Sequence, residues 1–298
     1  MSIKQTSLES GELNLASLLV CCADQIGTIA SLATFFAERD LSISRYAEYT
    51  DNGQCYTRFE WSINDLWEDE HAFAAEFSRL ANLYKASFDV RFMNRKQSIG
   101  LLVSRQAHGL IDMLNKVEAN YFSNADIRFI VSDDQSTQKI ADRHGVPFFY
   151  IAIDSAATEN SSLEYEKKQL DIIHRYKPDY LGLVDYKQVL SANFVEQVTC
   201  PIVGVNHSFI PSLIGTKPFQ IAHDRGVKLI GATSYFVTAQ VGDGPIIEQD
   251  VARIRSGASV QEMIKVGRDI QQKVFASAML KVLEHKTILH KNRTIIFD

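Results

Sequence analysis

Three side chains suited to acid/base chemistry lie in one short part of the chain, between residues 203 and 251. Asn206 and His207 are adjacent in the stretch VGVNHSF, and Asp243 stands in the later sequence GDG. An amide can donate a hydrogen bond to a carbonyl oxygen that gains charge, and an imidazole or a carboxylate can take up a proton. The segment therefore holds the groups that an acid/base site needs.

The composition is typical of a globular protein and excludes several functional classes. The chain of 298 residues has 46% hydrophobic residues and a net charge of −5, with its Lys and Arg residues scattered rather than clustered. No apolar run reaches the roughly 18 residues of a membrane span, and the N-terminal sequence MSIKQTSLES lacks the features of a signal peptide. We expect a cytoplasmic protein without a nucleic-acid or membrane partner.

The cysteines indicate neither a disulfide framework nor a metal site. Cys21, Cys22, Cys55 and Cys200 show no C-x-x-C spacing, and three of them fall in predicted strands. We expect buried, reduced thiols and no bound metal.

The first 93 residues predict a ferredoxin-like domain. Apolar periodicity gives the order strand, helix, strand, strand, helix, strand, with the turn sequence DNG between the two central strands. This is the order of the split βαβ unit, so we assign residues 1–93 to one α+β domain. The polar run at residues 94–98 is interpreted as a linker.

Residues 99–298 predict a doubly wound α/β domain. The runs IGLLVS, IRFIVS, PFFYIAI, YLGLV and PIVGV are continuously apolar and alternate with helical stretches, which is typical of parallel strands covered on both faces. Ligands bind beyond the carboxyl ends of such strands. The GDG sequence lacks the spacing of a phosphate-binding loop, so a nucleotide enzyme is not expected.

From about Leu13 to Phe297 the sequence resembles the formyltetrahydrofolate deformylase family. The resemblance rests on LLVSRQAHGLIDML, YKQVLS, HSFIPSLIGTKPFQIAHDRGVKLIGAT and GPIIEQDVARI. It implies an N-terminal ACT domain and a domain similar to glycinamide ribonucleotide transformylase. It further implies a hydrolase of one-carbon metabolism that supports purine biosynthesis and releases formate from 10-formyltetrahydrofolate, with a tetrahydrofolate derivative as substrate or cosubstrate and no permanently bound cofactor.

The positions at which the family carries its catalytic side chains read differently here. Its pattern N-I-H-H-S-F-L-P places an Asn at Gly204 and a His at Asn206, its A-T-A-H-Y places a His at Tyr235, and its L-D-x-G-P places an Asp at Gly242. Neighbouring residues offer a rebuilt site, in which Asn206 is the oxyanion donor, Asp243 the general base and His207 a supporting residue. Each also has a structural interpretation: a satisfied amide, a turn former and a structural histidine.

The resemblance also implies ligand-binding positions. The family's folate-contacting segment falls on residues 182–190, where Asp185 replaces an Arg of the family and Lys187 a Met. Further candidates for contact with the folate are Tyr186, His108 and Ser132. In the ACT half, an effector site of Asp24, Gly27 and Arg58 and a purely structural dimerisation role are equally open. An ACT domain implies a homodimer or homotetramer.

Two functions follow. The first is a folate-dependent one-carbon enzyme with an altered reaction or substrate, such as formyl transfer to an amine instead of hydrolysis. The alternative is a catalytically inactive paralogue that binds a folate or an amino acid and has a regulatory role.

Overall fold

The computed structural model describes residues 14–63, 70–104, 108–122, 124–153, 159–206, 218–240 and 242–298. Contacts divide the chain into two compact units. The first contains the residues up to Lys96 together with Glu284–Ile288 and Ile295–Asp298, and the second contains Gln97–Leu283 with Leu289–Thr294. The sequence-based boundaries place all of 99–298 in the second domain, whereas these contacts group most of the C-terminal tail with the first unit.

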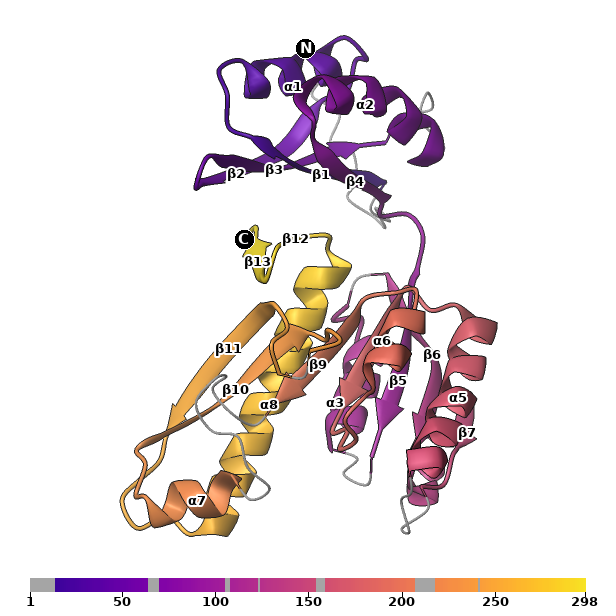
Figure 1. The fold of residues 1–298 in the computed structure, drawn as a ribbon, viewed down its shortest axis with the longest axis vertical. Coiled ribbons are helices and arrows are strands. Elements are labelled where there is room, and N and C mark those ends of the chain that lie inside the picture. The colour runs from indigo at the N-terminus through magenta and orange to yellow at the C-terminus, as the bar shows by residue number, and fades with distance from the viewer. Residues whose placement is uncertain are drawn as a thin grey trace, which may run out of the picture. The chain divides into compact units, whose positions relative to one another are not determined.

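The first unit has the ferredoxin-like fold that the sequence predicts (Figure 1). Its elements are β1 (Leu15–Ala23), α1 (Thr28–Ala37), β2 (Ile43–Asp51), β3 (Gln54–Ser62), α2 (Glu70–Tyr84) and β4 (Ser87–Phe92). The four strands form an antiparallel sheet in the order β2-β3-β1-β4. The predicted fold class of this half is confirmed.

Aromatic side chains fix helices α1 and α2 to one face of this sheet. Phe36 of α1 stacks on Phe59 of β3, and Trp61 of β3 stacks on Phe73 of α2, with ring centroids 5.0 Å and 4.8 Å apart. All four rings are almost completely buried, and burial of each such side chain stabilises the fold by about 2–3 kcal/mol. The helices therefore shield one face of the sheet from solvent.

The C-terminal tail covers part of the opposite face. It contains β12 (Thr287–His290) and β13 (Arg293–Ile296), which pair as a hairpin. Ile295 and Phe297 form a buried cluster with Leu19 of β1 and Tyr56 of β3. Because side chains alternate along a strand, β1 is apolar on both faces, which explains its continuously apolar sequence.

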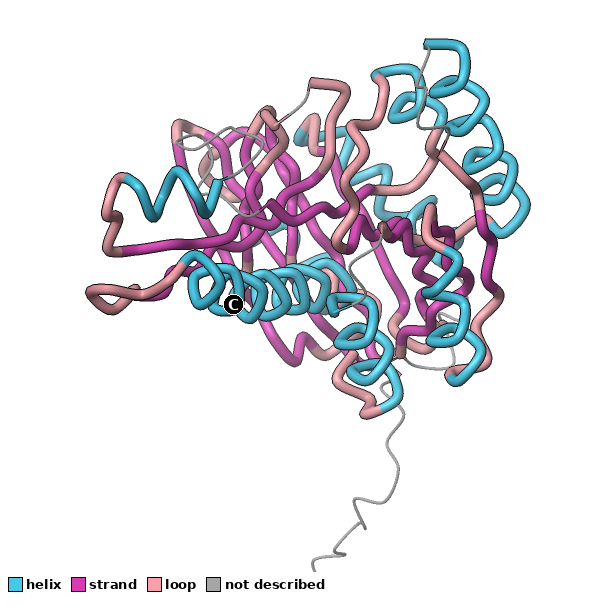
Figure 2. The backbone as a smooth tube through the Cα atoms, turned by 90° about the horizontal axis from the view of Figure 1, so that it is seen from below, coloured by secondary structure: helices cyan, strands magenta, loops and turns pink. Residues whose placement is uncertain are grey.

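The second unit is a mixed, mostly parallel sheet with helices on both faces (Figures 1 and 2). Its strands are β5 (Gln97–Val103), β6 (Ala125–Ser132), β7 (Phe148–Tyr150), β8 (Tyr180–Val184), β9 (Ile202–Asn206), β10 (Leu229–Phe236) and β11 (Ile246–Arg253). Its helices are α3 (His108–Glu118), α4 (Gln138–Arg143), α5 (Glu159–Tyr176), α6 (Ala192–Gln197), α7 (Pro218–Asp224), α8 (Val260–Leu283) and the short 3-10 helix Gln135–Thr137.

The strand order is β11-β10-β9-β8-β5-β6-β7. The strands β5 to β9 run parallel to one another, and β10 runs antiparallel to both β9 and β11. The predicted doubly wound architecture is thus confirmed, with two antiparallel strand pairings at one edge of the sheet. The carboxyl ends of β8 and β9 lie at the same edge of the sheet because these strands are parallel.

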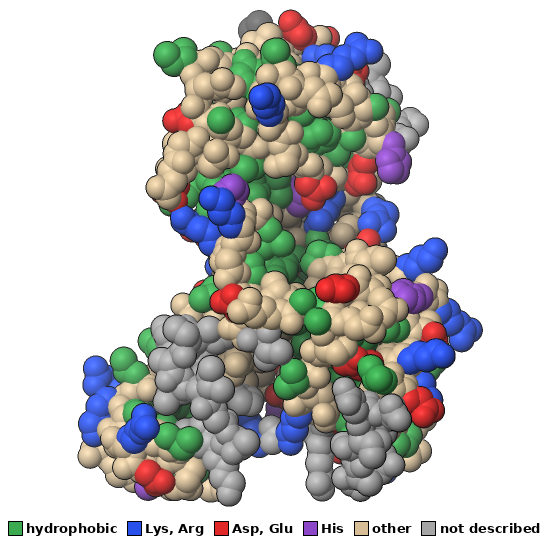
Figure 3. Space-filling view, in the orientation of Figure 1, with side chains coloured by type: hydrophobic (Ala, Val, Ile, Leu, Met, Phe, Trp, Pro, Cys, Tyr) green, Lys and Arg blue, Asp and Glu red, His purple; other side chains and the backbone are tan. Residues whose placement is uncertain are grey.

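Charged side chains of both signs are interspersed on the face of the molecule shown in Figure 3. None of the described helices is long and apolar enough to cross a membrane.

Candidate functional site

A pocket of about 240 Å³ lies at the carboxyl ends of β8 and β9 in the second unit. It is formed by the loop after β8, the end of β9, the end of β10 with the loop that follows, and one residue of α8. Its lining residues are Leu183, Asp185, Tyr186, Lys187, Gln188, Val189, Leu190, Val205, Asn206, Tyr235, Val237, Thr238, Gln240, Gly242 and Gln271. The place agrees with the general position of ligand sites in open α/β sheets.

The register between β9 and β10 decides which side chains meet at this pocket. Asn206 pairs with Thr233, and Gly204 pairs with Tyr235. Directly opposed residues of antiparallel strands point to the same face, and so do residues two apart on one strand. Gly204, Asn206 and Tyr235 therefore share one face of the sheet.

The three candidate catalytic residues have different positions. Asn206, the last residue of β9, is partly buried and lines the pocket. Asp243 is exposed, and its neighbour Gly242, not Asp243 itself, is among the described pocket-lining residues. His207 lies outside the described residues.

The loop after β8 carries three of the candidate ligand-binding residues, and all three line the pocket. The backbone N–H of Gly109, at the start of α3, donates a hydrogen bond of 2.8 Å to Asp185 Oδ2. Tyr186 Oη accepts a hydrogen bond of 3.1 Å from Gln169 Nε2, and Lys187 is exposed. Asp185 thus acts as a cap for α3, which accounts for an acidic residue at this position.

Ser132 and His108 do not line this pocket. Ser132 is completely buried, and its Oγ accepts a hydrogen bond of 3.1 Å from the backbone N–H of Asp134. His108 is the first residue of α3, is exposed, and has its Nε2 3.4 Å from Arg268 Nη1. Neither position brings the side chain to the pocket where Asn206 lies.

Several polar residues line the pocket that were not predicted as site residues, and two of them come from outside its loops. Tyr235 of β10 and Gln271 of α8 both line the pocket. Gln271 is the one polar side chain among the eleven buried residues of α8, and a lone Gln on an apolar helical face is visible in the sequence. The family resemblance marks Tyr235 only as a changed position, and its place beside Gly204 depends on the pairing of β10 with β9.

The two tyrosines that line the pocket are held in their neutral forms. Burial raises the pKa of Tyr235 above its ordinary value, and burial together with the neighbouring Tyr165 raises the pKa of Tyr186 well above its ordinary value. Both phenols therefore stay protonated and able to donate hydrogen bonds. Within the described residues no cluster of His, Cys, Asp or Glu side chains is arranged to hold a metal ion.

Comparison with known proteins assigns the family. Residues 97–279 match the formyl transferase family. The chain is 34% identical over 284 residues to the formyltetrahydrofolate deformylase of Synechocystis sp., covering 95% of this chain and 98% of that protein. It is 30% identical over 301 residues to the Bacillus subtilis formyltetrahydrofolate deformylase, covering 100% and 99% of the two chains. The chain belongs to the formyltetrahydrofolate deformylase family.

The deformylase fold extends over both halves. The crystal structure of a formyltetrahydrofolate deformylase from Pseudomonas syringae pv. tomato matches with a TM-score of 0.89 at 29% identity, and the match covers 95% of this chain and 94% of that one. The predicted resemblance is thus confirmed at the level of family and fold.

In the first unit of this deformylase-family chain, the candidate effector residues lie apart. Arg58 pairs with Leu19 in the sheet, whereas Asp24 and Gly27 lie beyond the end of β1, where Asp24 N–H donates to Gly53 O at 2.9 Å. Five residues of strand separate Leu19 from Asp24, which corresponds to about 17 Å at roughly 3.4 Å per residue. The strand register therefore does not bring Arg58 beside the turn that holds Asp24 and Gly27.

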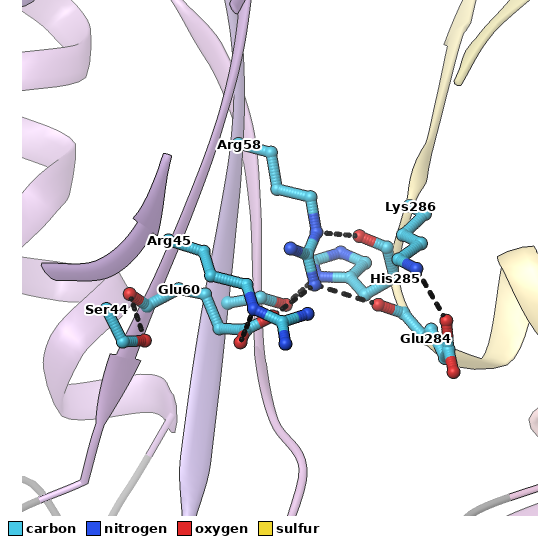
Figure 4. Close-up of polar contacts among 8 residues, drawn as sticks. Ser44, Arg45, Arg58, Glu60, Glu284, His285 and Lys286 are labelled. Atoms are coloured by element: carbon cyan, nitrogen blue, oxygen red, sulfur yellow. Dashed lines mark hydrogen bonds and ion pairs between the residues drawn. The ribbon is translucent and has the colours of Figure 1, made fainter. Parts of the chain in front are cut away.

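Arg58 instead binds the C-terminal tail (Figure 4). Its Nε donates to His285 O at 2.9 Å, and its Nη2 donates to Glu284 O at 3.1 Å and to Glu60 Oε2 at 2.9 Å. Arg58 and Glu60 are both buried. The guanidinium thus holds Glu284 and His285, the first residues after α8, on the sheet.

His285 continues this network with an arrangement that resembles a hydrolase triad. Its Nδ1 accepts from Ser17 Oγ at 2.5 Å, and its Nε2 donates to Asp89 Oδ2 at 2.8 Å, when the imidazole is neutral. Ser17 is completely inaccessible to solvent and His285 is 3% exposed. No substrate reaches the hydroxyl, so these bonds fasten the tail and do not form a catalytic site.

Proposed function

We propose that the chain binds 10-formyltetrahydrofolate in the pocket at β8, β9 and β10 and releases its formyl group as formate. The observation that supports this most directly is the position of Asn206, whose carboxamide lies at the carboxyl end of β9 on the pocket wall. In this proposal the Asn206 amide N–H donates a hydrogen bond to the formyl oxygen. Family membership supplies the substrate class.

The proposed reaction is a hydrolysis. Water adds to the formyl carbon, so a C–O bond forms and the carbonyl oxygen becomes negatively charged. The bond between that carbon and the folate nitrogen then breaks, the nitrogen takes up a proton, and formate leaves. A preorganised donor at the developing oxyanion typically contributes about 3–4 kcal/mol to such a step.

Asp243 completes the proposal as the general base that takes the proton from water, with His207 as a supporting residue. Asp243 follows Gly242, which lines the pocket, and a turn with a Gly at each side lets a short backbone change carry the carboxylate inward. Because Gly204 and Gly242 offer no side chain, the finer proposal is an altered reaction, in which an amine instead of water accepts the formyl group.

For the folate itself, Tyr186 and Lys187 are the proposed contacts from the loop after β8. The Lys187 ammonium is exposed at the pocket and suits a carboxylate of the folate tail, and Tyr186 presents an aromatic ring to the pocket wall. Asp185, His108 and Ser132 act indirectly in this proposal, since the first caps α3 and the other two lie away from the pocket.

A second candidate function is a folate-binding regulatory protein without catalysis. It is favoured by one observation. Among the described pocket-lining residues Asp185 is the one carboxylate, and its Oδ2 is engaged by Gly109 N–H. The other polar side chains of the pocket are amides, hydroxyls and the Lys187 ammonium, which bind a ligand without supplying a carboxylate base.

In either case the ACT unit is proposed to support a homodimer or homotetramer in the cytoplasm. A molar mass measured by light scattering during gel filtration tests the proposed oligomeric state.

The function is tested with the purified chain and 10-formyltetrahydrofolate, with released formate and folate binding measured in the same samples. The variant Asn206→Ala is expected to lower kcat by about 100- to 1,000-fold while the folate still binds. Asn193→Ala, at an exposed position of α6, is the matched control and is expected to behave as the wild type. Binding without formate release by the wild type contradicts the hydrolase and favours the regulatory protein or a transferase whose amine acceptor is missing.

A further inference from the structure

The hydroxyl group of Tyr235 lies in the space beside Gly204. The two residues are directly opposed across β9 and β10. A Cβ atom at Gly204 would lie 3.7 Å from Tyr235 Oη, 3.6 Å from Tyr235 Cζ and 3.1 Å from Val237 Cγ2. The tip of the phenol ring therefore occupies the volume that a side chain at position 204 would need.

The long side chain of Tyr235 thus packs against the position where Gly204 has no side chain. A Cβ at 204 requires Val237 to shift by a few tenths of an ångström, because 3.1 Å is tighter than most such contacts, and a side chain longer than alanine meets the phenol ring. The two positions form one unit in the packing of the pocket wall, and the polar atom that this unit presents is Tyr235 Oη.

That hydroxyl is available to a ligand. Tyr235 lines the same pocket as Asn206 and shares its face of the sheet. Among the described residues no hydrogen bond reaches Tyr235 Oη, whereas the hydroxyl of Tyr186 in the same pocket is bound to Gln169. Burial is the cause of the raised pKa of Tyr235, so the group stays protonated and donates.

We propose that Tyr235 is a catalytic residue whose hydroxyl donates a hydrogen bond to the formyl oxygen of the substrate, together with the amide of Asn206. This inference rests on the proposed function of the pocket. The proton of Tyr235 is not transferred: it stays on the phenol while the carbonyl oxygen gains charge and while the bond to the folate nitrogen breaks. The role is that of the second donor of an oxyanion hole.

Two donors at this oxygen have a kinetic consequence. A hydrogen bond that strengthens as charge develops lowers the barrier more than it tightens ground-state binding, so its removal lowers kcat and leaves KM nearly unchanged. A tyrosine that served only to fill space beside Gly204 would keep its function as phenylalanine, since the ring is retained. The two roles are therefore separable.

The experiment uses the full chain with Tyr235→Phe, which removes the hydroxyl and leaves the ring against Gly204. We expect a kcat for formate release lower by about 100-fold, with KM within about threefold and an unchanged thermal midpoint. Tyr180→Phe is the control: Tyr180 is a tyrosine of the same sheet, more deeply buried than Tyr235, with its hydroxyl 3.4 Å from Val282 O and outside the pocket.

A Tyr235→Phe enzyme with kcat within about threefold of the wild type overturns the inference while the proposed function stands. An equal loss in Tyr180→Phe also overturns it, because the loss then reflects a removed buried hydroxyl in general. A wild-type chain that binds the folate without forming formate refutes the proposed hydrolysis itself, and the role of Tyr235 with it. The variants thus distinguish the failure of one proposal from the failure of the other.

Discussion

The polar side chains of the pocket and those beneath the C-terminal tail differ in what they bind. Under the tail, Arg58, His285, Asp89 and Ser17 bind one another or the tail backbone at distances of 2.5 to 3.1 Å. At the pocket, Tyr235 Oη has no such bond to a described residue and the Lys187 side chain is exposed. Both regions contain residues that the sequence marks as candidates for ligand binding.

The difference shows how candidate residues of the same chemical type can be separated. A buried charge is stable only when partners within the protein satisfy it, so a network that is complete in the absence of a ligand has a structural role. A polar group that faces a cavity is satisfied by solvent or by a ligand. By this criterion Arg58 holds the tail in place, whereas the Tyr235 hydroxyl and the Lys187 side chain are available to a ligand.

The largest effect is expected from breaking the network under the tail. Arg58→Ala leaves Glu60 buried without its partner and two tail carbonyls, those of Glu284 and His285, without their donor. We expect a loss of about 3–5 kcal/mol in the free energy of unfolding, measured by denaturant titration. Arg45→Ala is the control, because Arg45 is exposed and lies 3.7 Å from the same Glu60, and it should cost less than about 1 kcal/mol.

An effect of Arg58→Ala as small as that of Arg45→Ala would contradict the structural role. If the variant also lost the response to a small amino acid, the effector interpretation of Arg58 would be favoured instead.

The next effect is a dependence of stability on pH that comes from the tail. Burial lowers the pKa of His285 to about 4 from an ordinary 6.5, against the bond to Asp89 and together with the positive charges of Arg91 and Arg58. The unfolded chain takes up this proton at a higher pH than the folded chain does. Stability is therefore complete above pH 6.5 and falls as the pH drops toward 4, by at most about 3 kcal/mol.

Unfolding titrations at several pH values between 7 and 4 measure this loss. In His285→Asn the slope should be shallower than in the wild type, since Asn does not titrate and accepts the left-handed backbone at this position, where φ is 54°. Asp89 adds to the loss at lower pH: burial raises its pKa, but the bond and charge of His285, the charge of Arg91 and the backbone N–H of Val90 together outweigh burial and hold the pKa below the ordinary 3.8. An identical slope in the variant would show that other groups cause the acid sensitivity.

The smallest effect is expected at Asp185, a residue that lines the pocket but is also bonded within the protein. Asp185 lines the pocket and caps α3 through Gly109 N–H. Asp185→Ala is expected to cost about 1–2 kcal/mol of stability, and Asp185→Asn less, since Asn retains an acceptor and tolerates the positive φ of 49°. Asp142→Ala at an exposed position of α4 should change stability by less than about 0.5 kcal/mol. Weakened folate binding without any loss of stability would instead assign Asp185 to the ligand.

Much of the fold follows from local patterns. The alternation of apolar runs and helices predicts both sheets, and the sequence Asp-Asn-Gly predicts the hairpin turn at which Asn52 and Gly53 have φ of 50° and 72°. The place of Asn206 at a pocket was predictable, because the carboxyl end of a parallel strand is where ligands bind. The C-terminal tail was not, since nothing in its local sequence says which surface it covers.

The sequence by itself determined the order of the elements and the family. It also showed that Gly204 and Gly242 stand where the family has catalytic side chains. These features depend on residue types and on spacing along the chain. Only the tertiary structure decided that Tyr235 stands against Gly204 and that Arg58 is engaged by Glu284 and His285. Those contacts depend on strand register and on the packing of segments far apart in the sequence, which no local pattern encodes.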